Sequence, residues 1–342
     1  MPPTATGICP ALVGLSALVP GVRGLGLGGV SSLVGPSGRT AVSVYRRRLP
    51  DFLVPFVDEG RTKHGDYDFP MTNPWFDRAF SAAVSEVYDE VLVPMIFDEF
   101  AKETSRMCGH VQSGSVLEIA AGTGVVTRAL AASLPRDVSL TATDLNQTMI
   151  DRARLVGTAR PVEWRRADVM ALPFADDSFD LAVCQFGVMF FEPKSDAFAE
   201  VRRVLRPGGR YLFSVWDGLE DNEFADVVAR SVAGLFSDDP PSFFERTPYG
   251  YHEQLTIVDD VTVAGFASPP TFERRSYTSR AATAREVATA FCAGTPLRSE
   301  IEHRRPDGLA EAVDVATEAV ARRFGRRDLE GRISAQFVSL DK

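Results

Sequence analysis

The feature that most constrains this chain is a strand, a sharp turn and a helix that follow one another directly near residue 120. The apolar-rich run Val116–Ile119 is too short for a helix and is bounded by Gly114 and by a turn, which favours a buried strand. The turn, Ala120–Gly124, consists mostly of Ala and Gly, so a ligand can approach its backbone. Helical spacing of apolar residues begins directly after it, and a helix start offers unpaired N–H groups. The stretch therefore predicts a ligand site at the end of a strand.

Two classes of ligand use such a turn, and the residues discriminate between them. A dinucleotide fingerprint has the form G-x-G-x-x-G, whose third glycine lets helix and strand pack closely. Counted from Gly122 the third position is Thr127, and counted from Ala120 the last is Val125, so the match fails in both registers. Glu118, at the end of the strand, would repel a pyrophosphate but suits a ligand with positive charge. S-adenosylmethionine, with its ammonium and sulfonium groups, is such a ligand.

Four motifs in order resemble those of one enzyme family. Glu118–Gly124 is similar to the E-x-A-x-G-x-G form of motif I in class I S-adenosylmethionine-dependent methyltransferases. Three further motifs resemble the small-molecule branch that includes the ubiquinone/menaquinone C-methyltransferases (methyltransferase type 11 domain): Ala171–Phe174, Asp176–Asp180 and Arg203–Gly209. The resemblance covers about residues 71–342 and is strongest over 116–216.

The resemblance implies an α/β fold: a Rossmann-like, doubly wound, mostly parallel seven-stranded sheet with an antiparallel last strand and a helical cover. It places the cofactor-binding core at residues 110–216 of a methyltransferase domain that spans 71–342. Further on, helical patterns at Ala284–Ala293 and Leu309–Phe324 lie between two strand-like runs. We therefore expect residues 280–328 to form a helical cover over the substrate.

Motif I would contribute Glu118, Ala120, Gly122 and Gly124 to the cofactor site. Asp144 follows 26 residues after Glu118, at the end of a β-rich run. An acid at the tip of the second strand can accept hydrogen bonds from both ribose hydroxyls, and charged acceptors make the stronger bonds. The alternative is that Asp144 caps the helix that follows it. We favour the ribose role.

Other residues of the core complete the predicted cofactor site. Leu145 and Met149 would line the adenine face. Asp168 could accept the adenine amino hydrogen while the Val169 N–H meets a ring nitrogen; a loop-capping aspartate is the alternative. Gln185 leaves the carboxyl end of the fourth strand, outside which ligands lie in open parallel sheets, and so falls beside the methyl group.

Tyr88 belongs to an N-terminal helical region that covers the cofactor in the resembled family. We expect its ring to touch the cofactor; the alternative is a core residue. A second amphipathic helical run is expected to begin just after Pro94.

The acceptor is predicted to be a small molecule. Methyltransferases acting on amide or exocyclic base nitrogens usually show N-P-P-Y after the fourth strand, and Gln185–Phe191 lacks it, which disfavours DNA, RNA or glutamine. The aromatic residues of this stretch suit an apolar or aromatic acceptor, methylated on carbon or oxygen, although ordinary core packing would also explain them. Such a nucleophile needs a base to remove its proton, and His252 is the candidate, with a structural histidine as the alternative.

Two other functions stay open from the residues. A nicotinamide-dependent oxidoreductase is disfavoured by Glu118 and by the missing third glycine. A module that binds S-adenosylmethionine without catalysis would keep the same donor motifs.

Composition excludes several partners. The net charge of −9 disfavours nucleic acid, because phosphate binding requires clustered cations. The four cysteines and four histidines are dispersed, without C-x-x-C or H-x-x-x-H spacing, so no metal site is expected. The lack of a paired cysteine spacing fits a reducing compartment.

The first 50 residues contain five Arg and no Asp or Glu. Pro20, Arg23 and many Gly interrupt their apolar residues, so a membrane span is not expected there. The acid-poor leader resembles an organellar transit peptide; the alternative is a start assigned too far upstream of Met71. We therefore expect residues 1–70 to be a disordered leader. The protein would be cytoplasmic, or in an organelle matrix or stroma if the leader is a transit peptide.

Overall fold

The strand-like runs of the sequence form one sheet in the computed structural model, which describes residues 86–342. The strands lie in the order β3-β2-β1-β4-β5-β7-β6. Strands β1 to β5 are parallel, and β7 runs antiparallel to both β5 and β6. The predicted fold, a mostly parallel seven-stranded sheet with an antiparallel last strand, is confirmed. The bounds are β1 Gly114–Ile119, β2 Val138–Asp144, β3 Glu163–Arg166, β4 Phe179–Gln185, β5 Leu205–Trp216, β6 Thr271–Thr283 and β7 Arg327–Asp341.

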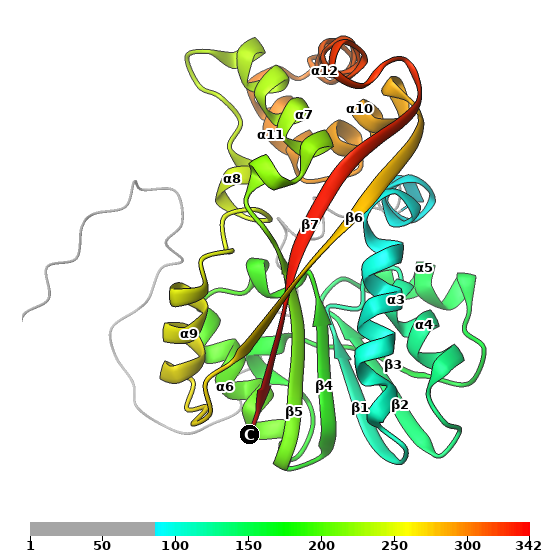
Figure 1. Cartoon of the computed structure of the whole chain (residues 1–342), viewed down its shortest axis with the longest axis vertical. Helices are drawn as coiled ribbons and strands as arrows, with labels where there is room; N and C mark the ends of the chain where they lie inside the picture. Colours follow the sequence, from blue (N-terminus) through cyan, green and yellow to red (C-terminus); the bar gives the residue numbers. More distant parts are fainter. Residues whose placement is uncertain (1–85) are drawn as a thin grey trace, which may run out of the picture. The chain divides into compact units, whose positions relative to one another are not determined.

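The strand order places helices on both faces of the sheet. From β1 the chain passes to β2 through α4 (Val125–Ser133) and to β3 through α5 (Gln147–Val156), whereas it leaves β4 in the other direction through α6 (Lys194–Val204). Right-handed crossovers in opposite directions put their helices on opposite faces. Figure 1 shows α4 and α5 beside α3 (Asp98–Met107), and α6 beside α9 (Gln254–Val263) on the other side. The reversal between β1 and β4 leaves a crevice outside the strand ends.

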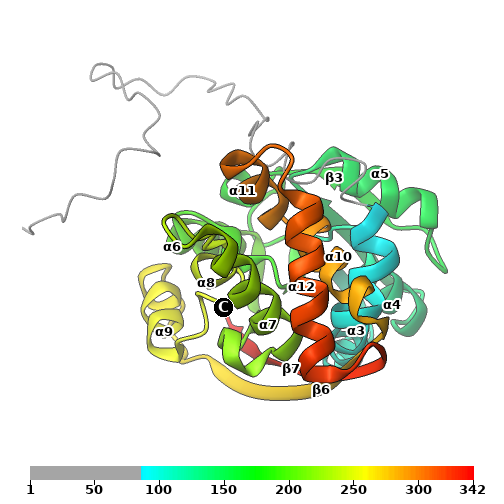
Figure 2. The ribbon, with the colours of Figure 1, turned by 90° about the horizontal axis from the view of Figure 1, so that it is seen from above.

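A group of helices lies beyond the carboxyl ends of the parallel strands (Figures 1 and 2). Its members are α7 (Glu223–Ala233), α10 (Ala284–Ala293), α11 (Leu297–Arg304) and α12 (Leu309–Phe324), and the short α8 (Phe243–Arg246) leads toward it. Helix α10 packs on α12, and α12 packs on α7. Thr283 and Glu286 form a capping box, which explains why α10 begins at Ala284 as expected. Helix α12 also has the expected bounds, while α7 and α11 enlarge the expected cover.

The N-terminal helical region differs from the expectation. The π-helix η1 (Tyr88–Phe97) contains Pro94, so a new helix does not begin just after this proline as the sequence indicated. The wider π-turn explains the difference, because the Asp98 N–H bonds the carbonyl of Val93, five residues back, and the helical path continues past the proline into α3.

The expected leader, residues 1–70, and residues 71–85 lie outside the described residues, so both explanations of the leader stay predictions. Between residues 86 and 342, no helix is both long and apolar enough to cross a membrane. The same range contains no group of three or more His, Cys, Asp or Glu side chains that could hold a metal ion.

Candidate functional site

Two adjoining cavities lie at the carboxyl ends of the parallel strands. The larger measures about 320 Å³, within the range of small-molecule sites. Nine of the eleven residues predicted to bind the cofactor line it: Tyr88, Ala120, Gly122, Asp144, Leu145, Met149, Asp168, Val169 and Gln185. The other two, Glu118 and Gly124, are not among its described lining residues. The sheet thus brings together residues that are up to 97 positions apart, from Tyr88 to Gln185.

The turn after β1 combines an open side with a packed side. Ala120, Gly122 and Gly124 all have positive φ, at 54°, 55° and 84°. A Cβ added to Gly122 would meet no atom within 4 Å, so the cavity comes directly up to the backbone there. A Cβ added to Gly124 would lie 3.0 Å from the Trp164 ring and 3.1 Å from Cβ of Ala153. Gly124 therefore allows close packing, and the geometry gives it no contact with the cavity.

Asp144 ends β2 with its carboxylate held by two backbone groups. Oδ2 accepts from the Gly122 N–H and Oδ1 from the Asn146 N–H, both at 2.8 Å. The cap of α5 is Asn146, whose side chain accepts from the N–H groups of Thr148 and Met149. The alternative that Asp144 caps this helix is therefore wrong. Each carboxylate oxygen can accept a further hydrogen bond from a ligand in the cavity.

Glu118 lies behind the turn and not in the cavity wall. It is only 2% exposed, and among the described residues its Oε2 finds no hydrogen-bond partner. Burial raises the pKa of Glu118 to about 8, and the nearby charge of Asp144 adds to this increase. One oxygen of this buried carboxyl group has no partner among the described residues, although a backbone hydrogen bond from Thr127 and the charge of Arg128 already favour the ionised form in part. A further cation nearby would stabilise the ionised form.

Asp168 and Gln185 both face the larger cavity and also make bonds within the protein. Asp168 Oδ1 accepts from the Met170 N–H at 2.9 Å, so the loop-capping alternative is present in addition to the cavity contact. Gln185 accepts from the Thr104 hydroxyl at 2.7 Å and donates to the Phe97 carbonyl at 3.4 Å. The orientation of the Gln185 amide is therefore fixed by the helical region η1–α3.

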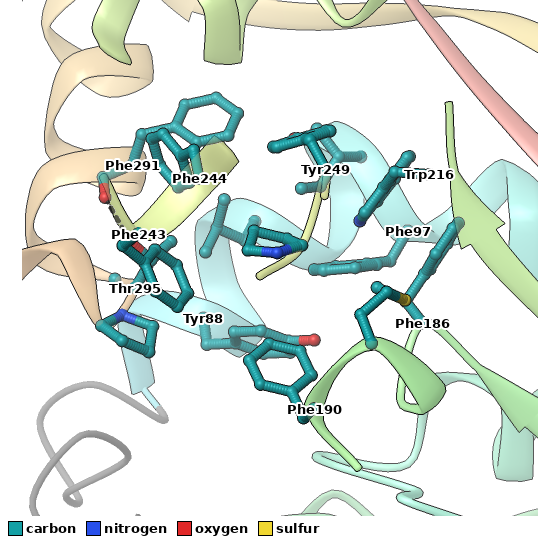
Figure 3. Close-up of a pocket in the computed structure, with 16 residues that line it drawn as sticks. Tyr88, Phe97, Phe186, Phe190, Trp216, Phe243, Phe244, Tyr249, Phe291 and Thr295 are labelled. Carbon is teal, nitrogen blue, oxygen red and sulfur yellow. Dashed lines mark hydrogen bonds between the residues drawn. The ribbon is translucent and has the colours of Figure 1, made fainter. Parts of the chain in front are cut away.

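The smaller cavity measures about 90 Å³ and is mainly apolar and aromatic (Figure 3). Its wall comes from η1, from the ends of β4 and β5, from the segment around α8 and from the α10–α11 connection. The lining residues are Tyr88, Leu92, Ile96, Phe97, Phe186, Met189, Phe190, Trp216, Phe243, Phe244, Pro248, Tyr249, Phe291, Gly294, Thr295 and Pro296. None of these described lining residues is a Lys, Arg, His, Asp or Glu.

Three aromatic residues, Tyr88, Phe186 and Phe190, line both cavities and form the wall between them. Phe186 has a φ of +54°, which is unusual for a bulky residue. Its ring stacks on Trp216 with centroids 3.8 Å apart and the planes only 4° from parallel. Strained backbone of this kind is concentrated at functional sites, where surrounding packing maintains it.

His252, the predicted base, is held next to Tyr249, a lining residue of the smaller cavity, without lining that cavity itself. Its Nδ1 is 2.8 Å from the Tyr249 carbonyl oxygen, and its Nε2 is 3.3 Å from Glu253. It is not among the described residues that line either cavity. The geometry therefore supports the alternative of a structural histidine and does not support a general base at this position.

Sequence reasoning missed the far wall of the smaller cavity. Phe243 and Phe244 follow the Pro240–Pro241 break, and Phe291 lies in α10, which the sequence places only in a general cover. The only local sequence signal for this wall was the pair Phe243–Phe244, which closely follows the pair Pro240–Pro241.

The fold and the cavity together define a class of protein. A doubly wound parallel sheet binds nucleotide-like ligands outside its strand ends, at the position where the strand order reverses. Here that position carries an open turn after β1, a fixed carboxylate after β2 and a buried acid behind the turn. The class is that of Rossmann-like enzymes for a cationic nucleoside.

Comparison with known proteins gives the family. The pattern of a methyltransferase domain matches residues 117–213. A demethylmenaquinone methyltransferase from Clavibacter sepedonicus is 32% identical over 178 residues, which cover 48% of this chain and 70% of that protein. A malonyl-[acyl-carrier protein] O-methyltransferase from Halorhodospira halophila is 28% identical over 268 residues, or 76% of this chain and 83% of that protein. Phosphoethanolamine N-methyltransferase 2 from Haemonchus contortus shares the fold, with a TM-score of 0.50 and 17% identity over 78% of this chain and 59% of that chain.

The chain belongs to the S-adenosylmethionine-dependent methyltransferase family. Its cofactor is S-adenosylmethionine and its reaction is methyl transfer, so the oxidoreductase alternative and the non-catalytic alternative are both set aside. The names of the three relatives indicate three different acceptors, and a shared fold and donor do not identify the acceptor of this chain.

Proposed function

We propose that the larger cavity binds S-adenosylmethionine and that Asp144 holds its ribose. The carboxylate of Asp144 is the observation that carries this proposal, because two backbone N–H groups fix it at the cavity wall with acceptor capacity to spare. Gly122 and Ala120 let the methionine part approach the turn, and its ammonium group would stabilise the ionised form of Glu118.

The remaining wall suits the base and the reacting end of the donor. Leu145 and Met149 offer apolar contact to the adenine, and Asp168 with the Val169 N–H can pair with its edge. Tyr88 lines both cavities, and Gln185 lines the larger one next to Phe186, which also lines both. The methyl group would therefore point toward the aromatic wall.

The smaller cavity would receive the acceptor, a small neutral molecule with an apolar or aromatic reacting end. Its volume of about 90 Å³ is below the roughly 300–1,000 Å³ of common ligand pockets, so it fits the reacting end of an acceptor and not a large ring system. A malonyl group ends in a carboxylate, and a buried carboxylate requires a cationic partner. The described wall offers none, which argues against an acceptor of the malonyl type.

Positioning and exclusion of water supply most of the catalysis in this proposal. Bound S-adenosylmethionine supplies a methyl group on an already activated leaving group. The protein aligns the nucleophile by packing it against Phe186, Phe190 and Tyr88 and keeps water out of the apolar wall. Burial raises the pKa of Tyr88 and of Tyr249, so both phenols stay protonated at neutral pH and cannot act as bases. The acceptor would therefore be a carbon or oxygen acid that loses its proton readily to solvent, such as an acidic phenol or an enol. The sulfonium charge of the donor would balance the resulting anion, and transfer of the methyl group would neutralise both charges.

Ligand binding and a matched acceptor panel test the proposal. Calorimetry should show binding of S-adenosylhomocysteine and not of NADH. With labelled S-adenosylmethionine, small neutral phenols and enols should gain the label, while the same compounds carrying a carboxylate on the ring should not. Preferential methylation of the carboxylated compounds would contradict the assignment of the acceptor. Failure to bind S-adenosylhomocysteine would contradict the donor site itself.

A further inference from the structure

Asp89 connects three walls of the proposed donor site, and we infer that it is a positioning residue that fastens η1 over the methyl donor. This inference rests on the proposed function of the larger cavity. Asp89 directly follows Tyr88, which lines both cavities, and its side chain is only 9% exposed. It lines neither cavity itself, so its effect on the ligand must pass through other residues.

Two arginines from different helices hold the Asp89 carboxylate. Its Oδ2 accepts from Nε of Arg152 on α5 at 2.9 Å, and its Oδ1 lies 3.5 Å from Nη2 of Arg128 on α4. Arg152 also pairs with Glu90 at 3.2 Å. Arg128 donates through Nη1 to the Thr123 carbonyl at 2.7 Å, inside the motif I turn.

Each element joined by this carboxylate supplies part of the cavity wall. Helix α5 supplies Met149, the motif I turn supplies Gly122 and η1 supplies Tyr88. A charge-assisted hydrogen bond from a half-buried arginine is stronger than an exposed ion pair, and it fixes geometry as well as distance. Loss of the Asp89 charge would free the start of η1 and, with it, the Tyr88 ring. The two arginines would stay behind without a counter-charge in a partly buried site.

Glu103 provides a matched control within the same helical region. Its side chain is 10% exposed and accepts from two arginines, Arg106 at 2.7 Å and Arg275 at 2.8 Å. It lies on α3, and it is absent from the described lining of both cavities. Asp89 and Glu103 therefore share burial and ion pairing. They differ in their arginines, because Arg128 also bonds the motif I turn, whereas the described hydrogen bonds of the Arg106 and Arg275 side chains go only to Glu103, Glu273 and Arg274.

The experiment compares Asp89→Asn with Glu103→Gln in the full chain, with S-adenosylhomocysteine as the probe. Both variants should lose thermal stability. Only Asp89→Asn should raise the dissociation constant for S-adenosylhomocysteine. The expected increase is about tenfold, which corresponds to the loss of one charged hydrogen bond, and it should come chiefly from faster dissociation. Asp89→Glu, which keeps the charge, should recover part of the affinity. Arg152→Met should weaken binding similarly, and adding it to Asp89→Asn should cost little more.

Three outcomes are decisive. Equal affinities of Asp89→Asn and Glu103→Gln for the probe would overturn the inference and leave the donor site intact. The same holds if Asp89→Asn does not fold and Arg152→Met binds with the affinity of the unmodified protein. An unmodified protein that does not bind S-adenosylhomocysteine would instead overturn the proposed function.

Discussion

Replacing Glu118 by Gln should make the protein more stable at pH 8 and weaken its binding of the methyl donor. The carboxyl group is 2% exposed, with one oxygen that has no partner among the described residues, and burial raises its pKa to about 8. Ionising it in the folded protein therefore costs free energy. A glutamine has nearly the same shape and never ionises, so it avoids this cost and also loses the attraction for a cation.

The magnitude follows from the change in pKa on folding. In the unfolded chain the group has its ordinary pKa of 4.5, so between pH 4.5 and 8 the folded state binds more protons than the unfolded state. The free energy of unfolding then falls as pH rises through this window, by about 1.4 kcal/mol per pH unit and about 5 kcal/mol in total. A buried glutamine amide with an unmet hydrogen bond costs about 1–3 kcal/mol. The net gain of the Glu118→Gln variant at pH 8 should be about 2–4 kcal/mol, and near pH 5 it should vanish or change sign.

Urea unfolding followed by tryptophan fluorescence at several pH values between 5 and 8 measures this difference. The unmodified protein should lose stability relative to the variant as pH rises, while other titrating groups affect both alike. Saturating S-adenosylhomocysteine should reduce the difference, because its ammonium group favours the ionised carboxylate. Parallel stability curves across this range, or a variant that is less stable at pH 8, would refute the reasoning about Glu118.

Three further substitutions test other parts of the structure. Asp144→Ala should raise the dissociation constant for S-adenosylhomocysteine at least about 100-fold, because it removes the two charge-assisted hydrogen bonds proposed to the ribose. The control Asp151→Ala, at an exposed position of α5, should leave the dissociation constant measured by calorimetry unchanged. Gly187→Ala should lower the free energy of unfolding by about 1–3 kcal/mol, because the new Cβ would lie 2.6 Å from Cβ of Ala120 and from Sγ of Cys184. An unchanged melting temperature would contradict this packing. Phe291→Leu should enlarge the smaller cavity and raise kcat/KM for bulkier neutral acceptors in the panel, while the affinity for S-adenosylhomocysteine stays the same. A change in that affinity without a change in acceptor preference would contradict the division into two cavities.

The donor half of the site was predictable because its residues follow strand ends in fixed order. A parallel sheet brings the turn after β1 and the acid after β2 to one edge, whatever the intervening loops contain. Finer roles did not follow from this order. The sequence could not show that Gly124 packs against Trp164 and Ala153 while Gly122 faces open space, because both glycines have the same local pattern. Nor could it show that Glu118 lies behind the cavity wall.

Most of the acceptor half could not be predicted because no local rule brings its residues together. The stretch Gln185–Phe191 suggested an apolar acceptor from the sequence, with core packing as the alternative, but Phe97 and Phe291 lie in distant helices and each reads in the sequence as an ordinary core residue. Only their packing leaves a cavity among them, and its chemistry depends on which side chains the described wall lacks. In the acceptor proposal, the feature that matters is therefore that none of the described lining residues of the smaller cavity is a cation. A motif search detects residues that are present, so acceptor class has to be read from the walls of the folded cavity.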